Sequence, residues 1–280
     1  MKVGLILMVK KILSFVIVLS LFSLMAACGS STETNSSSDV RTVEVASAAE
    51  SQPLSWKVSG GELKGYEPDV LRAIDEKLPQ YKFNLHGVSD EAEETGLATG
   101  KYDIAAGGYY KTAGREEQFL IPEENDGLSL MKIYVREDSD IQGIKDLVGK
   151  KIVPPTTGGG VYHFLVNWEK ENPEYKLEYK TSSAAMPYPV RLQEVAQGKY
   201  DALILPSNLG EATVIAEQKL PIRATDPVKI NKTYLIIHKS EENKELSDAV
   251  NKALKELKED GTLAKLSIQW FGENMFEYDK

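Results

Sequence analysis

The sequence predicts an α/β protein made of two lobes of similar build. Short apolar segments alternate with helical patterns along most of the 280 residues, which is typical of sheets flanked by helices. The tetrapeptide Gly-Lys-Tyr-Asp occurs twice, at residues 100–103 and 198–201, each time after a helical pattern and before an apolar segment. A unit of helix, turn and strand is therefore present in two distant copies, and we assign one copy to each lobe.

The N-terminal segment is expected to lie outside the folded body. Three lysines precede the short apolar run Ile12–Leu24 and a junction of small residues, a pattern typical of a secretory signal peptide over residues 1–27. The only cysteine, Cys28, follows Met-Ala-Ala and resembles the lipid-modified cysteine of bacterial lipoproteins. The alternative is a plainly cleaved signal with an incidental cysteine. Residues 28–42 are polar and are expected to form a flexible tether.

The charge of the chain excludes some classes of partner. The formal net charge is −9, and removal of a signal peptide carrying three lysines makes it more negative. This sign argues against binding nucleic acid and against adhesion to anionic lipid through a basic patch. A chain exported with one cysteine has no internal disulfide, so its stability must come from core packing.

The predicted elements of the first half alternate between strand and helix. Pro68 suits the first turn of a helix that runs through Leu78. Asp90 and Glu93 have the spacing of a capping box at the start of another helix. The predicted strands are Val43–Ala46, Tyr81–Leu85, Tyr102–Ala106, which breaks at Gly107–Gly108, and the extended segment Leu128–Val135.

The second half continues the same alternation. Apolar residues spaced i, i+3, i+4, i+7 predict a helix over residues 161–168. Ser207 is placed to cap a helix that reaches about Lys219, and Gly261 is placed to end the long helix that begins near Leu246. A short helix Ile141–Lys150, strands at Lys151–Val153, 202–206, Pro221–Val228 and Tyr234–His238, and a last helix over residues 263–270 complete the pattern.

The segment Gly100–Arg115 is the first candidate for a binding site. In open α/β sheets, ligands bind outside the carboxyl ends of strands, and this segment places two tyrosines, a threonine and Arg115 just beyond such an end. The guanidinium of Arg115 suits a carboxylate, which it can hold with two hydrogen bonds. The alternative is a strand end, a turn and a surface arginine in a salt bridge.

The glycine-rich loop over residues 154–160 is the second candidate. It opens the predicted helix at residue 161, and free backbone N–H groups at a helix N-terminus favour an anion. The ending typical of a nucleotide P-loop is absent. The alternative is a flexible connection.

Several motifs in order resemble the substrate-binding lipoproteins of bacterial polar amino-acid ABC importers, the type II periplasmic binding protein family. The resemblance covers nearly all of residues 43–272. Its carriers are Gly-Tyr-Glu-Pro-Asp at 65–69, both Gly-Lys-Tyr-Asp copies, Thr-Ala-Gly-Arg at 112–115, Ile-Lys-Asp-Leu at 144–147, and Asp-Gly-Thr and Trp-Phe-Gly at 260–262 and 270–272.

The resemblance implies a two-lobed fold in which each lobe is a mainly parallel sheet flanked by helices. Lobe 1 would comprise residues 43–130 and 234–280, and lobe 2 residues 131–233. Two hinge strands, Leu128–Ile133 and Ile230–Tyr234, would join them. The implied partners are an amino acid or related small carboxylate, a permease and its ATPase, and the outer face of the cytoplasmic membrane through the lipid anchor. The protein is expected to be a monomer.

The resemblance also implies roles for particular residues. Arg115 would bind the ligand α-carboxylate, helped by Gly108, Tyr110, Thr112, Thr157 and Gly158. Relatives usually place an ammonium-binding aspartate where this chain has Pro206, followed by Ser207, and an aromatic residue where it has Asp90. The loop after the first strand offers Ser47 in place of an acid that some relatives carry.

These departures leave two possibilities open. Either the ligand has no ordinary α-ammonium, or another carboxylate binds it, with Glu50, Glu67 and Asp90 as candidates. Asp90 has the alternative role of a helix cap. Tyr66, Tyr109 and Trp56 are candidates for an apolar wall, although such residues are also routine in cores.

The sequence therefore predicts a non-enzymatic receptor that closes on a small carboxylate. The three histidines lie on separate elements without metal-ligand spacing, and neither a metal nor a cofactor is expected. One alternative is an enzyme on the same fold, similar to cyclohexadienyl dehydratase, with Asp90 or Glu67 as its acid or base. A second alternative is a ligand-sensing partner of a membrane receptor kinase.

Overall fold

The computed structural model describes residues 40–184 and 186–280. The predicted signal peptide, Cys28 and most of the tether lie outside the described residues. Residues 40–280 form one compact unit. Among the helices that the structure describes, none is both long enough and apolar enough to cross a membrane.

Strands and helices alternate along the described chain, as the sequence predicts. The strands are β1 (Arg41–Ala48), β2 (Glu50–Ser51), β3 (Ser55–Lys57), β4 (Leu63–Lys64), β5 (Tyr81–Val88), β6 (Ile104–Tyr110), β7 (Phe119–Leu120), β8 (Gly127–Arg136), β9 (Ala202–Pro206), β10 (Ile222–Ala224) and β11 (Lys229–His238). The helices are α2 (Tyr66–Lys77), α3 (Asp90–Ala98), α4 (Ala113–Gln118), α5 (Gly160–Glu171), α6 (Tyr188–Ala196), α7 (Glu211–Glu217), α8 (Glu242–Glu259) and α9 (Thr262–Phe271), with 3-10 turns η1 (Ile144–Leu147) and η2 (Met275–Tyr278).

One mixed sheet runs through the described chain in the order β10-β8-β11-β6-β1-β5, with β7 paired to β11 and β9 paired to β8. The first half of β8 pairs with β11, and its second half pairs with β9. The second half of β11 pairs with β6 instead. The two long strands therefore pair with each other and then continue into different parts of the sheet.

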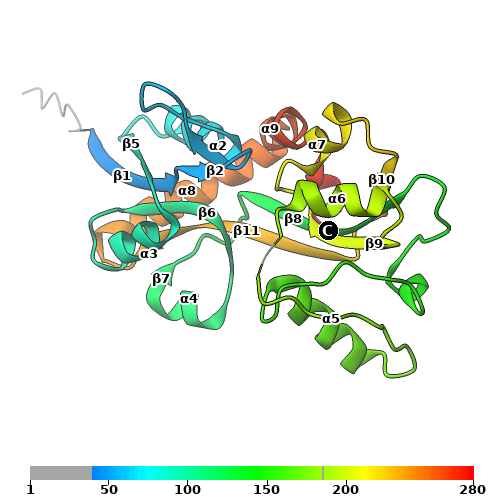
Figure 1. Ribbon diagram of the computed structural model, residues 1–280. Helices are drawn as coiled ribbons and strands as arrows, with labels where there is room; N and C mark the ends of the chain where they lie inside the picture. The colour runs from blue at the N-terminus through cyan, green and yellow to red at the C-terminus, as the bar shows by residue number, and fades with distance from the viewer. Residues whose placement is uncertain (1–39, 185) are drawn as a thin grey trace, which may run out of the picture. The chain divides into compact units, whose positions relative to one another are not determined.

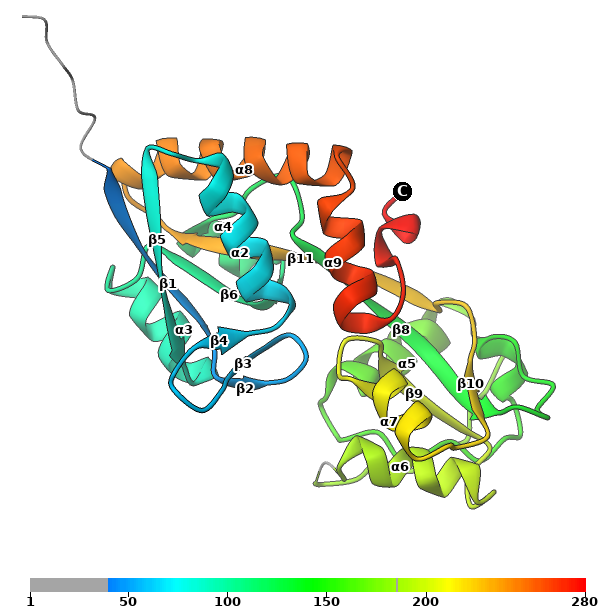
Figure 2. The same cartoon turned by 90° about the horizontal axis from the view of Figure 1, so that it is seen from above.

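The part of the sheet formed by β5, β1, β6 and the end of β11 lies between two layers of helix (Figure 2). Successive residues of each strand face opposite sides, because strand side chains alternate. On β1, Val43 and Val45 pack in the core with α2, α8 and α9, whereas Ala46 packs in the core with Leu97 of α3. The helical layers therefore bury both faces of these strands, which is why the second half of β1 and the first half of β6 are mostly apolar.

The part of the sheet formed by β8, β9 and β10 is covered on both faces as well (Figure 1). Phe164 and Leu165 of α5 pack with Ile133 and Ile204 on one face. The other face packs against α6, where Leu192 contributes to the core. The core residues of the two parts fall on either side of the predicted lobe boundaries, and those boundaries stay a prediction.

The glycines of the two Gly-Lys-Tyr-Asp copies have the same conformation. Gly100 and Gly198 have φ values of 74° and 75°, in the left-handed region that favours glycine. Each follows the end of a helix, α3 or α6, and lets the chain turn back towards a strand.

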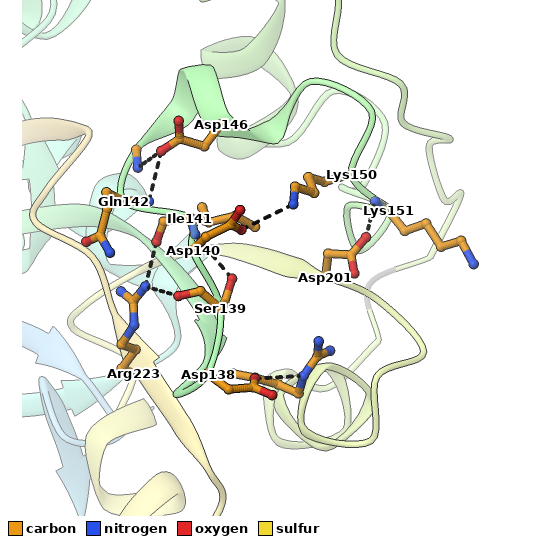
Figure 3. Close-up of polar contacts among 12 residues, drawn as sticks. Asp138, Ser139, Asp140, Ile141, Gln142, Asp146, Lys150, Lys151, Asp201 and Arg223 are labelled. Carbon is orange, nitrogen blue, oxygen red and sulfur yellow. Dashed lines mark hydrogen bonds and ion pairs between the residues drawn. The ribbon is translucent and has the colours of Figure 1, made fainter.

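The aspartates of the two copies also make equivalent contacts. The carboxylate of Asp103 accepts a hydrogen bond from the Glu44 backbone N–H at 2.9 Å, and that of Asp201 accepts one from the Lys151 N–H at 2.7 Å. Figure 3 shows the second of these bonds. In each copy the aspartate N–H donates in return to the carbonyl of the same partner. The two tetrapeptide copies therefore form the same local structure, a turn at the glycine and an aspartate bonded to a neighbouring backbone, as predicted.

Some local predictions were wrong. The strand β6 continues through Gly107 and Gly108, where its pairing with β11 shifts register instead of ending. Only η1 forms within the predicted helix Ile141–Lys150, and Ile152 makes a single bridge instead of a strand. The predicted parallel character holds for the pairs of β1 with β5 and β6, but β9 and β10 pair antiparallel with β8. The long strand β8 belongs to neither copy of the helix–turn–strand unit, so that unit does not set the direction in which β9 pairs with it.

The helix start predicted at residues 89–93 is confirmed, because α3 begins at Asp90, but the predicted capping box of Asp90 and Glu93 and the predicted cap at Ser207 were wrong. Ser89 occupies the N-cap of α3, Asp90 is its first residue, and no side chain caps it. Helix α7 starts at Glu211 after Gly210, and the buried Ser207 lies before it without a capping role.

Candidate functional site

Arg115 lies in the first turns of α4, directly after β6. Thr112 is the N-cap of this helix, and its side-chain oxygen accepts the Arg115 backbone N–H at 3.3 Å. The Thr-x-x-Arg spacing thus has a local cause, because the capping threonine fixes the residue three positions later. The arginine side chain is partly exposed, with 30% of its surface accessible.

The guanidinium of Arg115 is held by three groups. Its Nη1 donates to the Tyr110 carbonyl at 3.1 Å, and its carbon Cζ lies 4.8 Å from the centre of the Tyr109 ring. Its Nε and Nη2 both donate to one oxygen of Glu94, at 3.2 and 2.7 Å. A carboxylate therefore already occupies the donors that would bind a ligand carboxylate.

Arg115 lines a pocket of about 340 Å³ at the N-terminal end of α3. The other lining residues are Gly107, Tyr109 and four acidic residues, Asp90, Glu91, Glu93 and Glu94. This pocket brings Arg115 and Asp90 together, two of the predicted site residues. It has one guanidinium and four carboxyl groups, and the acids outnumber the cation.

Glu93 is the buried member of this set, with 1% of its surface exposed. The Tyr109 hydroxyl donates to its Oε2 at 2.6 Å, and its Oε1 has no hydrogen-bond partner among the described residues. Burial raises the pKa of Glu93 to about 8, although the hydrogen bond from Tyr109 acts in the opposite direction. The charges of Asp90 and Glu94 raise it further.

Two more carboxyl groups are buried nearby. Glu67 accepts the Gly108 backbone N–H at 2.6 Å, and burial, followed by the charge of Asp126, raises its pKa well above the ordinary value. Burial also raises the pKa of Asp126 to about 6. The Asp126 carbonyl accepts the hydroxyl of Tyr66. This part of the fold therefore holds protons at pH values where ordinary carboxyl groups have lost them.

These carboxyl groups predict a decrease in stability with rising pH. A carboxyl whose pKa is raised by folding stabilises the native state below its unfolded value, and this contribution is lost as pH rises through the folded value. For Glu93 the window runs from about 4.5 to about 8. We expect the unfolding free energy of wild-type protein to fall by about 1–3 kcal/mol across this window because of Glu93 alone.

Urea denaturation of wild type and Glu93→Gln at pH 5 and pH 8 measures this effect. Glutamine cannot ionise, so replacing Glu93 removes the pH-dependent loss of stability. Relative to wild type, the unfolding free energy of the variant should rise by that amount at pH 8 and change little at pH 5. Glu91→Gln, at an exposed position of the same helix, is the control. Parallel pH profiles for wild type and Glu93→Gln would contradict the assignment.

Several other predicted residues lie in buried or bonded positions. Ser47 is fully buried, and its hydroxyl donates to Ser55. Tyr66 is 2% exposed and packs on Phe271. The Gly108 N–H is bonded to Glu67, so it is not free for a ligand. Trp56 packs edge-on against Trp270. Ligand contacts of these residues stay predictions.

Tyr110 and Thr112 lie beside Arg115 but face other surroundings. Tyr110 is exposed and lines a different pocket together with Lys111 and residues 229–232 and 234 of β11. Thr112 is exposed and caps α4. Glu50 is exposed on β2 and lines a third pocket, which Asp90 also borders.

The predicted site residues of the second half lie near the starts of α5 and α7. The N–H and the hydroxyl of Thr157 both donate to the Ser182 carbonyl, and Gly159 donates to Thr156. Gly158 has open space around it, and the first residues of α5 supply N–H groups without intrahelical partners. Pro206 ends β9, and the buried Ser207 hydroxyl lacks a partner.

Two residues of the site were missed by the sequence prediction. The spacing of Glu93 predicts a capping-box role only, and no sequence motif predicts a role for Glu94. The signal for both was the run of four acids in residues 90–94, which a solvated helix start equally explains.

The fold is that of the two-lobed periplasmic binding proteins. A structure of a probable amino-acid ABC transporter extracellular-binding protein, YtmK of Bacillus subtilis, covers 83% of this chain and 98% of its own at a TM-score of 0.68 and 27% identity. The L-cystine solute receptor of Neisseria gonorrhoeae, in an unliganded open conformation, covers 85% and 95% at a TM-score of 0.70. Its identity of 23% shows likeness of fold.

The chain belongs to the bacterial extracellular solute-binding proteins, family 3, whose model matches residues 43–273. Among its relatives, the L-cystine-binding protein TcyK of Bacillus subtilis is 28% identical over 265 residues, which is 92% of this chain and 94% of the relative. The family assignment confirms the resemblance seen in the motifs.

Proposed function

We propose that this chain is the exported, lipid-anchored receptor of an amino-acid ABC importer and that it has no enzymatic activity. It binds an amino acid or related small carboxylate and delivers it to the permease. The observation that carries this proposal is Arg115, which lines a pocket beside the end of β6 and keeps its guanidinium against Tyr109. Membership of a solute-binding family supports it.

The relatives narrow the class of ligand. Three relatives are named as L-cystine-binding proteins, TcyK, TcyJ and TcyA of Bacillus subtilis, and another as the arginine-binding extracellular protein ArtP of the same organism. Amino acids share an α-carboxylate, which is the group that an arginine fork binds. L-cystine is therefore the first ligand to test.

Closure of the two lobes provides the proposed mechanism. The predicted hinges, Leu128–Ile133 and Ile230–Tyr234, lie within β8 and β11, which pair with each other and then diverge. A ligand shifts such an equilibrium only by its differential affinity for the closed state. Contacts to Arg115 from one lobe and to the start of α5 from the other would supply that difference.

Thermal unfolding of the purified protein with amino acids, cystine and simple carboxylates tests the function. A ligand present at a thousand times its dissociation constant adds about 4 kcal/mol of stability. We expect stabilisation by one or a few amino acids and unchanged ligand after incubation. Consumption of the ligand would favour an enzyme, and stabilisation only by compounds without a carboxylate would contradict the proposal.

A further inference from the structure

The pocket beside Arg115 has a charge balance that a simple anion does not fit. Arg115 faces four carboxyl groups of α3 across the same 340 Å³ pocket. One of them, Glu94, already neutralises the guanidinium through two hydrogen bonds to one oxygen. A ligand carrying only a carboxylate would meet the remaining acids as like charges, which disfavours its binding. A ligand that also carries a cation would find a partner for each of its charges.

We propose that Glu93 binds the ammonium group of the ligand, so that the pocket recognises the zwitterion of an α-amino acid. This inference rests on the proposed receptor function and assigns the group that replaces the aspartate absent at Pro206. The carboxylate of the ligand displaces Glu94 from Arg115, and the ammonium donates a hydrogen bond to Oε1 of Glu93. Glu93 thereby determines specificity for ligands with an amine.

Glu93 is singled out by its fixed position. Oε2 is held by the Tyr109 hydroxyl, while Oε1 is buried and unpartnered within a residue that lines the pocket. A buried carboxyl oxygen without a partner is costly unless a ligand supplies one. Asp90 and Glu91 are exposed, and Glu94 is bonded to Arg115.

Tyr109 connects the two halves of the pocket. Its ring lies against the guanidinium of Arg115, and its hydroxyl holds Glu93. One side chain therefore sets the positions of the cation and the anion that a zwitterion would contact. Both contacts exist before any ligand binds, which reduces the ordering cost of binding.

Gly107 provides the space for this carboxylate. A Cβ atom at residue 107 would lie 2.5 Å from Oε2 of Glu93 and 3.1 Å from the Tyr109 ring. Its backbone does not require glycine, because its φ lies outside the left-handed region. The absence of a side chain at this position is therefore explained by the place that Glu93 and Tyr109 occupy.

The protonation state of Glu93 gives the proposal a distinctive signature. Its raised pKa, with Asp90 and Glu94 raising it and Tyr109 lowering it, means that the carboxyl is mostly protonated at pH 6.5 without ligand. Arg115 and Glu91 are the other charged groups in the pocket. An ammonium ion favours the carboxylate form, so binding should release about one proton from Glu93 to the buffer.

Matched ligands test the assignment. L-cystine, 3,3′-dithiodipropionate and cystamine share one disulfide skeleton, but the second lacks the ammonium groups and the third lacks the carboxylates. We expect wild type to bind L-cystine at least about 30-fold more tightly than dithiodipropionate, because only L-cystine gives the buried Oε1 of Glu93 a charged hydrogen-bond partner. In Glu93→Gln this preference should fall to within a few-fold, while Glu76→Gln, at an exposed position of α2 outside this pocket, keeps it. If the thermal screen selects another amino acid, that amino acid and its desamino analogue replace the first two probes.

Calorimetric titration at pH 6.5 in buffers of different ionisation enthalpy measures the proton count. Wild type should release about one proton per L-cystine bound, and Glu93→Gln none. Urea denaturation at pH 6.5 checks that the variant folds. Equal affinity of wild type for L-cystine and dithiodipropionate, or an unchanged preference in Glu93→Gln, would overturn the inference about Glu93. The proposed receptor function would still stand. If no amino acid stabilised the protein in the thermal screen, the proposed receptor function itself would be rejected.

Discussion

Replacement of Arg115 by alanine is expected to weaken ligand binding at least about 30-fold while leaving the fold intact. The guanidinium is the only cation among the described residues that line its pocket, and it is oriented by the Tyr110 carbonyl and the Tyr109 ring. Removing one partner of a buried, hydrogen-bonded charge pair costs about 2–5 kcal/mol of binding free energy. That loss corresponds to an affinity about 30-fold to several thousand-fold weaker.

Titration calorimetry with the amino acid selected by the thermal screen measures this loss. The unliganded stability should change little, because the Arg115–Glu94 pair is partly exposed and such pairs contribute little. Arg136→Ala is the matched control, since Arg136 pairs with the exposed Asp138 and is not among the residues that line this pocket. Unchanged affinity in Arg115→Ala would remove the main support for a carboxylate site.

Glu94→Gln is expected to strengthen ligand binding in the same pocket, the opposite of the effect of Arg115→Ala. Glu94 holds Nε and Nη2 of Arg115, so a ligand carboxylate must displace it. Without the negative charge this competition weakens, and we expect a few-fold gain in affinity, in the range of an exposed ion pair. A loss of affinity in this variant would mean that Glu94 assists the ligand instead of competing with it.

The repeat and the position of Arg115 could be predicted because their causes are local. A left-handed glycine after a helix and an aspartate that binds a neighbouring backbone are read from four residues. The cap at Thr112 lies three positions before Arg115. The pairing direction of β9 could not be predicted, because β8 comes from a different part of the chain.

The role of Glu93 could not be read from its neighbours in sequence. Residues 90–94 have the composition of a solvated helix start, which hides the single acid that faces inward. The burial of Glu93 depends on Tyr109, a residue of β6, and on the absence of a side chain at Gly107. Ser47 shows the same limit, because only its contact with Ser55 reveals that its hydroxyl is bonded.

Gly65→Ala is expected to destabilise the protein by at least about 3 kcal/mol, from two independent causes. Gly65 has φ of 128° and ψ of 179°, a region almost restricted to glycine, where other residues incur about 1–3 kcal/mol of strain. A Cβ atom there would also lie 2.4 Å from the Leu54 carbonyl oxygen and 2.9 Å from that of Pro53. Overpacking against backbone adds about 1–3 kcal/mol more.

These two carbonyls also explain why the effect should reach the binding site. They accept the N–H groups of Tyr66 and Glu67, the first residues of α2. A shift that relieves the clash would move the start of this helix, and with it the Glu67 carboxyl that holds the Gly108 N–H. Gly65→Ala should therefore weaken ligand binding as well as folding.

Two glycine controls separate the causes when urea unfolding is measured for each variant. Gly61 has φ of 90° but open space around its Cβ position, so Gly61→Ala should cost only the strain of a left-handed residue, about 1–2 kcal/mol. Gly114 lies in α4 with open space and without a positive φ, so Gly114→Ala should be neutral or slightly stabilising. Equal losses for Gly65→Ala and Gly61→Ala would show that the carbonyls of Pro53 and Leu54 can move aside, and the proposed link from this turn through Glu67 to Gly108 would then be lost.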